Sequence, residues 1–276
     1  MRLPKALLTF VLCGLLSSVV FAQDPARVRV AHLSPDAPPV DILVNDAVAF
    51  ENISFPSTTV YAELAAGMYN IKVVPTGTTE PVVIDVDLMF EAGTSYTAAA
   101  VNILDKIEPI LLVDDNTLNP NRGRLRFVHA SPNAPRVDIA IKDGPVIYRN
   151  VSFKEDGPYR QGPAGTYDLE VRLAGTKEVV LDIPGVEFIA NRVVTVFAIG
   201  LVEGEPPLGV FAAIDASCTA DLDENGIVDI QDVVRFAELF QTRDLSIDFD
   251  GNGVVNRADT LFFIEKWGKS DEVCDC

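Results

Sequence analysis

The sequence predicts a mainly β protein, in which two tandem β-sandwich domains precede a small all-α module. The β prediction depends on a tandem repeat with an offset of 97 residues and on short strand-like runs between turn residues. The prediction of a separate C-terminal module depends on two acidic 12-residue loops, each followed by an amphipathic segment. A chain of 276 residues has room for two or three domains.

The start of the chain, residues 1–22, predicts a signal peptide. Arg2 and Lys5 supply positive charge, and Ala6–Leu16 is an apolar run too short to span a bilayer comfortably. Residues 20–22 read VFA, which is typical of a cleavage site, so we expect the mature chain to begin at Gln23. We expect a secreted or cell-surface protein with no membrane insertion after cleavage; an uncleaved anchor is the alternative.

The charge balance excludes some classes of partner. The chain has 40 acidic and 22 basic residues and a net charge of −18, which is unsuited to nucleic acid or to an anionic membrane surface. Half of this excess lies in residues 219–276, where 14 acidic and 5 basic residues are found. Such a concentration of carboxylates repels itself unless cations neutralise it.

The two copies of the repeat begin with the same motif. Arg27–Ile42 reads RVRVAHLSPDAPPVDI and Arg124–Ile139 reads RLRFVHASPNAPRVDI, with 10 of 16 positions identical. Apolar and polar residues alternate in later segments such as Tyr167–Leu173, the period of a half-buried strand. We therefore expect β-sandwich domains over residues 27–115 and 124–215.

The repeated motif, His-x-Ser-Pro-x-Ala-Pro-x-Val-Asp, resembles that of domain-of-unknown-function family 4397, a family of exported bacterial β domains. The resemblance covers both copies, from Arg27 to Asp215. It implies Ig-like β-sandwiches and a bacterial, extracytoplasmic location, and it implies no activity.

Each copy places a histidine near a serine and an aspartate, the groups of a hydrolase triad. His32 lies near Ser34 and Asp41, and His129 has the equivalent neighbours. Triads are assembled from separate elements and need an oxyanion hole, and the sequence has no motif of a nucleophile elbow. We therefore expect these side chains to hold the first strand and its turn by local hydrogen bonds, with ligand contact and catalysis as alternatives. The sequence has no convincing catalytic constellation.

The two acidic loops predict calcium binding. Asp221–Asp232 reads DLDENGIVDIQD and Asp248–Asp259 reads DFDGNGVVNRAD. Both have oxygen-bearing side chains at positions 1, 3, 5, 9 and 12 and glycine at position 6, which allows the sharp turn that brings the ligands together. The alternative is a solvated acidic loop pair without metal.

Two such loop–helix units resemble a type I dockerin, the module that docks proteins onto cohesin domains. The resemblance implies two calcium ions, held in the first loop by Asp221, Asp223, Asn225, the Ile227 carbonyl, Asp229 and Asp232, and in the second by Asp248, Asp250, Asn252, the Val254 carbonyl, Asn256 and Asp259. Partner recognition in dockerins lies largely at loop positions 10 and 11, which are Ile230, Gln231, Arg257 and Ala258. The two pairs differ, which disfavours symmetrical docking on a cohesin-like partner.

Each loop leads into a predicted helix. Val233, Phe236 and Phe240 share one face after the first loop, and we expect Leu261, Ile264 and Trp267 to form the corresponding face after the second. Three cysteines of the mature chain flank this module, at Cys218, Cys274 and Cys276. In an oxidising compartment, a disulfide from Cys218 to either of the others would join both ends of residues 219–276.

Three hypotheses for function follow. The first is an exported non-catalytic binding or assembly protein with a calcium-dependent docking module. The second is a component of a polysaccharide-degrading assembly, associated with glycoside hydrolases and with carbohydrate as a ligand. The third is an adhesin or matrix protein. An exposed aromatic strip on the β domains would favour carbohydrate binding, whereas a polar surface would favour a spacer.

Overall fold

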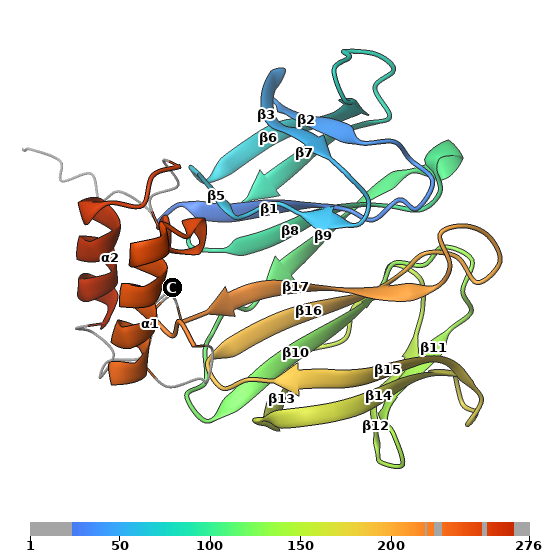
Figure 1. Cartoon of the computed structure of the whole chain (residues 1–276). Helices are drawn as coiled ribbons and strands as arrows, with labels where there is room; N and C mark the ends of the chain where they lie inside the picture. Colours follow the sequence, from blue (N-terminus) through green and yellow to red (C-terminus); the bar gives the residue numbers. More distant parts are fainter. Residues whose placement is uncertain (1–23, 219, 224–227, 250–252, 268–276) are drawn as a thin grey trace, which may run out of the picture.

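The computed structural model describes residues 24–218, 220–223, 228–249 and 253–267 (Figure 1). In this part of the chain, strands form four sheets, two from each repeat, and two α-helices follow them. The prediction of a mainly β fold is confirmed. The predicted signal peptide lies outside the described residues. No helix among the described residues has the length and apolar character needed to cross a bilayer.

The first repeat forms two sheets. In one, the strand order is β4-β1-β8-β9 with β5 also paired to β1, and in the other it is β3-β2-β6-β7. β1 and β8 are parallel, and the other pairs are antiparallel. The elements are β1 (Ala26–His32), β2 (Val40–Val44), β3 (Ala47–Ile53), β4 (Ser57–Thr58), β5 (Ala62–Leu64), β6 (Gly67–Pro75), β7 (Ile84–Phe90), β8 (Ser95–Val101), the 3-10 helix η1 (Leu104–Lys106) and β9 (Glu108–Asp114).

The second repeat has the same topology, with sheet orders β13-β10-β16-β17 and β12-β11-β14-β15. Its parallel pair is β10 with β16. The strands are β10 (Arg122–His129), β11 (Val137–Ile141), β12 (Val146–Val151), β13 (Arg160–Pro163), β14 (Gly165–Leu173), β15 (Val179–Phe188), β16 (Arg192–Ile199) and β17 (Gly209–Ser217). The duplication seen in the sequence is thus a duplication of a two-sheet unit.

The core of each repeat lies between its two sheets. Val30 and Ala100 of one sheet pack with Ile42 and Val73 of the other in the first repeat. In the second repeat, Phe127 and Val196 belong to the same buried cluster as Ile139 and Val171. Two sheets enclosing an apolar layer are the arrangement of a β-sandwich.

The two repeats also pack against each other. A third buried cluster contains residues of both repeats. Ala31 of β1 and Leu33, which directly follows β1, pack in it with Val128, Ala130 and Phe197 of the second repeat. Figure 1 shows the sheet that contains β1, β8 and β9 beside the sheet that contains β10, β16 and β17. The two central sheets are therefore buried on both faces, and the four sheets form one layered body.

Buried arginines cross this interface in both directions. Arg29 of β1 forms an ion pair with Asp215 of β17 and donates from Nη1 to the Ile214 carbonyl at 2.8 Å. Its Nε donates to Thr97 Oγ1 at 2.8 Å, and Tyr159 donates its hydroxyl proton to Asp215 at 2.7 Å. The Arg29 side chain is 2% exposed and that of Asp215 is fully buried.

An arginine of the second repeat makes the equivalent contacts with the first repeat. Arg126 of β10 forms an ion pair with Asp114 of β9 and donates from Nη1 to the Val113 carbonyl at 2.9 Å. Its Nε donates to Thr195 Oγ1 at 3.1 Å, and Tyr61 donates its hydroxyl proton to Asp114 at 2.7 Å. The repeats are therefore joined by two equivalent networks about a pseudo-twofold axis.

Two helices follow β17 and pack on each other. They are α1 (Ile230–Thr242) and α2 (Arg257–Trp267), with a 3-10 turn η2 (Leu245–Ile247) between them. Figure 1 shows both helices beside the end of the β layers at which β17 finishes. Phe236 of α1 stacks on Phe263 of α2, with ring centroids 4.4 Å apart, at the centre of a small apolar cluster.

The predicted inner face of the first helix agrees with the structure and that of the second does not. Val233, Phe236 and Phe240 belong to the small cluster. Leu261 and Ile264 are each 55% exposed and Trp267 is 36% exposed, so these three do not form the buried face. Phe263 is the buried aromatic residue of α2, and its ring stacks on Phe236.

Candidate functional site

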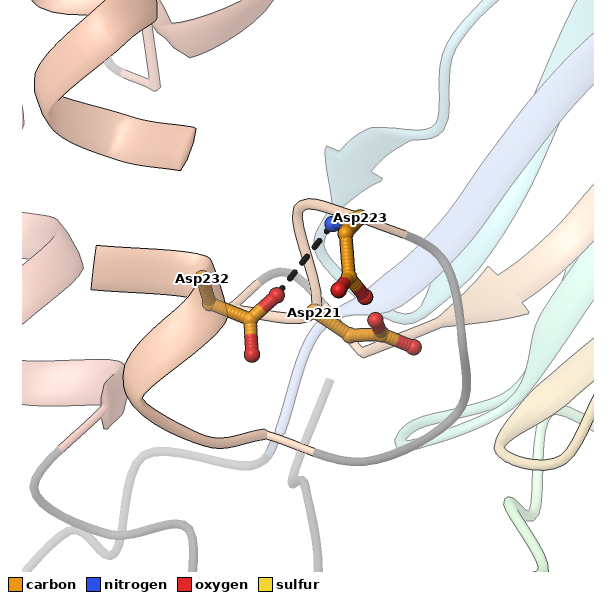
Figure 2. A group of neighbouring side chains, drawn as sticks. All are labelled: Asp221, Asp223 and Asp232. Carbon is orange, nitrogen blue, oxygen red and sulfur yellow. Dashed lines mark hydrogen bonds between the residues drawn. The ribbon is translucent and has the colours of Figure 1, made fainter. Parts of the chain in front are cut away.

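The first acidic loop brings three carboxylates together. The ligand oxygens of Asp221, Asp223 and Asp232 all lie within 4.8 Å of one another (Figure 2). Calcium–oxygen distances of 2.3–2.6 Å place two ligands of one ion at most about 5 Å apart, so this spacing fits a shared ion. Oxygen donors alone suit a hard cation. The predicted ligands Asn225 and Ile227 lie outside the described residues.

Asp232 fixes the shape of this loop. Its side chain is buried, and Oδ1 accepts from the backbone amide of Leu222 at 2.6 Å and of Asp223 at 3.2 Å. The other oxygen, Oδ2, accepts from the Asp229 amide at 2.8 Å. Asp229 caps the start of α1 by accepting from the Gln231 amide at 2.7 Å. The aspartate at position 12 thus ties both ends of the loop to the start of the helix.

The second loop repeats part of this arrangement. Asp259 is buried and accepts from the backbone amides of Phe249 and Asn256, each at 2.8 Å. Asp248 accepts from the Gly253 amide at 2.7 Å across the turn. Gly253 has φ +79, in the left-handed region, as the sharp turn requires. The predicted ligands Asp250 and Asn252 lie outside the described residues.

One predicted ligand pair of the second loop is arranged differently. The Asn256 side-chain amide donates to the Val254 carbonyl at 2.8 Å, while its oxygen accepts from the Ala258 amide at 2.8 Å. The carbonyl and the side-chain oxygen predicted as ligands are therefore both engaged within the protein. The bond from Ala258 is equivalent to the one that Asp229 accepts from the Gln231 amide, and the bond from the Asn256 amide to Val254 is particular to the second loop.

The two loops are held together by contacts from the opposite unit. Trp267 at the end of α2 donates from Nε1 to the Asp229 carbonyl at 3.2 Å. Arg243, which ends α1 in a left-handed conformation, donates to the Val255 carbonyl at 2.6 Å. Each loop is therefore in contact with a residue at the end of the other unit's helix.

The residues predicted for partner recognition lie at the starts of the helices and are exposed. Ile230 is 61% exposed, and Gln231, Arg257 and Ala258 are also at the surface. Cys218 is buried directly after β17, while Cys274 and Cys276 lie outside the described residues. The disulfide therefore stays a prediction.

The repeated histidines are used in local hydrogen bonds, as expected from the sequence. His32 Nε2 lies 3.1 Å from the Pro38 carbonyl, and His129 Nε2 lies 3.1 Å from the Pro135 carbonyl. Both rings are buried, and burial lowers the pKa of each below its usual value. They are neutral imidazoles that close the turn after the first strand of each repeat.

The aspartates of the same motif hold a second turn. Asp41 accepts from the backbone amides of Asn52 and Gly77, each at 2.8 Å, and these bonds lower the pKa of its carboxyl. Asp138 makes the equivalent bonds in the second repeat, at 2.7 and 3.0 Å. The motif therefore places its histidine and aspartate side chains in separate structural roles.

The polar feature that sequence reasoning missed is the pair of arginine networks between the repeats. Arg29 and Arg126 occupy the third residue of the repeated motif, in strands whose other residues are largely apolar. A charged residue at the same strand position in both copies was a signal that both arginines are buried and paired. The partners Asp114 and Asp215 come from different strands and carry no comparable signal.

Comparison with known proteins identifies the β part of the chain. No curated protein matches it. The family described as Domain of unknown function (DUF4397) matches residues 26–140 and 125–222 in two overlapping segments. These segments contain both repeats of the motif and all four sheets. The chain therefore belongs to the DUF4397 family.

Proposed function

We propose that this protein is an exported, non-catalytic assembly protein whose dockerin-like C-terminal module is organised by calcium. The observation that carries the proposal is the convergence of Asp221, Asp223 and Asp232 within 4.8 Å at the start of α1. The β repeats act as a rigid support, because their double-sided packing and crossed ion pairs leave little freedom between them. The exposed starts of α1 and α2 are the docking surface for a cohesin-like or other surface protein.

Calcium would neutralise the excess of carboxylates in the C-terminal module, where 14 acidic residues face 5 basic ones. In the first loop, one carboxylate oxygen each of Asp221, Asp223 and Asp232 lies within 4.8 Å of the others. An ion there offsets the mutual repulsion of the carboxylates and fixes the loop against the helix that it caps. The second loop binds more weakly, since Asn256 replaces a carboxylate and leaves this loop with one negative charge fewer.

The second candidate, a component of a polysaccharide-degrading assembly, draws less support from the β domains. Carbohydrate sites are commonly built on exposed aromatic rings, and no Phe or Tyr in the described part of the β repeats belongs to the exposed class. This surface favours the role of a spacer or support. An adhesin or matrix protein would use the same support and the same module.

A chelator experiment on the mature chain tests the proposal. We expect melting to show a C-terminal transition that depends on calcium and a β transition that does not. Asp223→Asn removes one ligand charge from an exposed position and is expected to weaken calcium binding about tenfold or more. Glu238→Gln removes a charge from the exposed face of α1 and serves as the control. Equal effects of the two substitutions would contradict a site at the first loop.

A further inference from the structure

A cleft opens at one edge of the second repeat, between β12 of one sheet and β13 of the other. Its volume is about 480 Å³, which is in the range of roughly 300–1,000 Å³ typical of small-molecule sites. The walls are largely apolar and come from both sheets of the sandwich. They include Ile141, Val146, Ile147, Tyr167, Leu169 and Phe188.

The two repeats differ at this edge. In the first, Leu64 of β5 pairs with Ala26 and packs against the buried ring of Phe90. At the equivalent pair of the second repeat, Gly162 of β13 lies opposite Gly123. The second repeat has no side chain at this position, and the ring of Phe188 lies so close that a Cβ added at Gly162 would meet it at 3.0 Å. The apolar opening is a local difference between two otherwise similar domains.

A basic side chain lines the cleft. Arg160 lines it and also lines an adjoining, more polar cleft of about 630 Å³, together with Arg149 and Lys154. Lys154 pairs with Glu108 at 2.8 Å. Neither Arg149 nor Arg160 forms an ion pair with any carboxylate in the described part of the chain. Unpaired guanidinium groups at an apolar opening are complementary to an anion with an apolar tail.

The acidic residues of the adjoining cleft have other partners. Glu155 accepts from the Ser152 amide at 2.8 Å, which lowers the pKa of its carboxyl. Asp156 lies 3.9 Å from Nη1 of Arg126, the arginine of the interface network. These contacts give the two carboxylates partners other than Arg160, whose guanidinium lies over the Tyr148 ring at 6.0 Å from its centroid.

We propose that the cleft between β12 and β13 binds a free alkyl carboxylate of medium chain length. The alkyl chain lies between the two sheets, against the apolar side chains of Ile147, Leu169 and Phe188. The carboxylate lies at the mouth and accepts charge-assisted hydrogen bonds from Arg160. This site involves none of the calcium-binding residues, so its failure would leave the proposed function intact.

Calorimetric titration of the mature chain with sodium hexanoate, octanoate and decanoate tests the proposal. We expect one site, with affinity rising about fourfold for each buried methylene group. Arg160→Gln is expected to weaken decanoate binding roughly tenfold, since it removes a charged hydrogen-bond donor. Gly162→Leu places a side chain against the Phe188 ring that lines the cleft and is expected to abolish binding. Lys142→Gln, at a half-exposed lysine outside the cleft, is the control and leaves affinity unchanged.

Three results would overturn the proposal. One is the absence of binding heat up to the solubility limit of decanoate. Another is decanol binding as tightly as decanoate, because that would remove any role for the arginine. The third is unchanged decanoate affinity in Arg160→Gln. Arg160 is at the surface, and the melting temperature of the variant shows whether it is folded. This variant therefore tests the proposal even if Gly162→Leu does not fold.

Discussion

Arg29→Met tests the crossed ion pairs that join the two repeats. The substitution keeps an unbranched apolar stem in β1 and removes the guanidinium. Asp215 then remains fully buried without its cation, although Tyr159 and Thr195 still donate hydrogen bonds to it. The result is an uncompensated buried charge at the interface.

The expected loss of unfolding free energy is about 3–5 kcal/mol, the usual cost of removing one partner from a buried ion pair. The control is Lys72→Met, which removes a pair with Asp46 whose side chains are 25% and 75% exposed. Exposed pairs contribute about 0–1 kcal/mol, so the two substitutions differ by several-fold in effect. Arg29→Met with Asp215→Asn removes both charges and is expected to recover part of the loss.

The assay is urea denaturation of the mature chain, followed by fluorescence and by circular dichroism. The pH dependence gives a second signature. Burial raises the pKa of Asp215 in the folded protein, and loss of Arg29 removes an influence that lowers it. A raised carboxyl pKa means that the folded state binds the proton more tightly than the unfolded state, so acid stabilises it. The deficit of the variant should therefore shrink as pH falls from neutrality.

A loss below about 1 kcal/mol in Arg29→Met, equal to that of Lys72→Met, would refute the reasoning. It would mean that the interface is held by its apolar cluster alone. A deficit that grows with falling pH would contradict the assignment of the buried charge to Asp215.

Two further predictions follow from the repeat. Arg126→Met leaves Asp114 without its cation and is expected to lower the free energy of unfolding by about 3–5 kcal/mol, measured by the same urea denaturation. A tenfold smaller loss would contradict the pseudo-twofold symmetry. His32 and His129 are expected to titrate below pH 6.5 in an NMR pH series; since their pKa values are lowered in the folded state, stability falls as pH decreases through their unfolded value. Titration of either ring above 6.5 would contradict its burial as a neutral imidazole.

The sequence was sufficient to predict the β class and the duplicated unit, because these depend on local periodicity and on a long identical motif. The role of His32 in a local turn also followed from sequence, since its partner Pro38 is only six residues away. The inner face of the first helix was predictable for the same reason. Val233, Phe236 and Phe240 are spaced so that one side of the helix is apolar.

The parts that could not be predicted depend on contacts between distant segments. The inner face of α2 was predicted wrongly because Leu261 and Ile264 fit the helical period as well as Phe263 does. The stacking of Phe263 on Phe236 of α1 determines which residues of α2 are buried. Arg29 and Asp215 are separated by 186 residues, and nothing in either local sequence indicates their contact. The cleft in the second repeat is lined by residues of β11 to β15, which come together only in the folded sandwich.

The central claim of this account is that calcium organises the C-terminal module, and calorimetric titration of the metal-free mature protein with calcium tests it most directly. We predict two binding events, the tighter one lost or weakened in Asp223→Asn, with no change in the β transition. No binding heat at millimolar calcium would contradict the claim and would leave the acidic loops as a solvated surface.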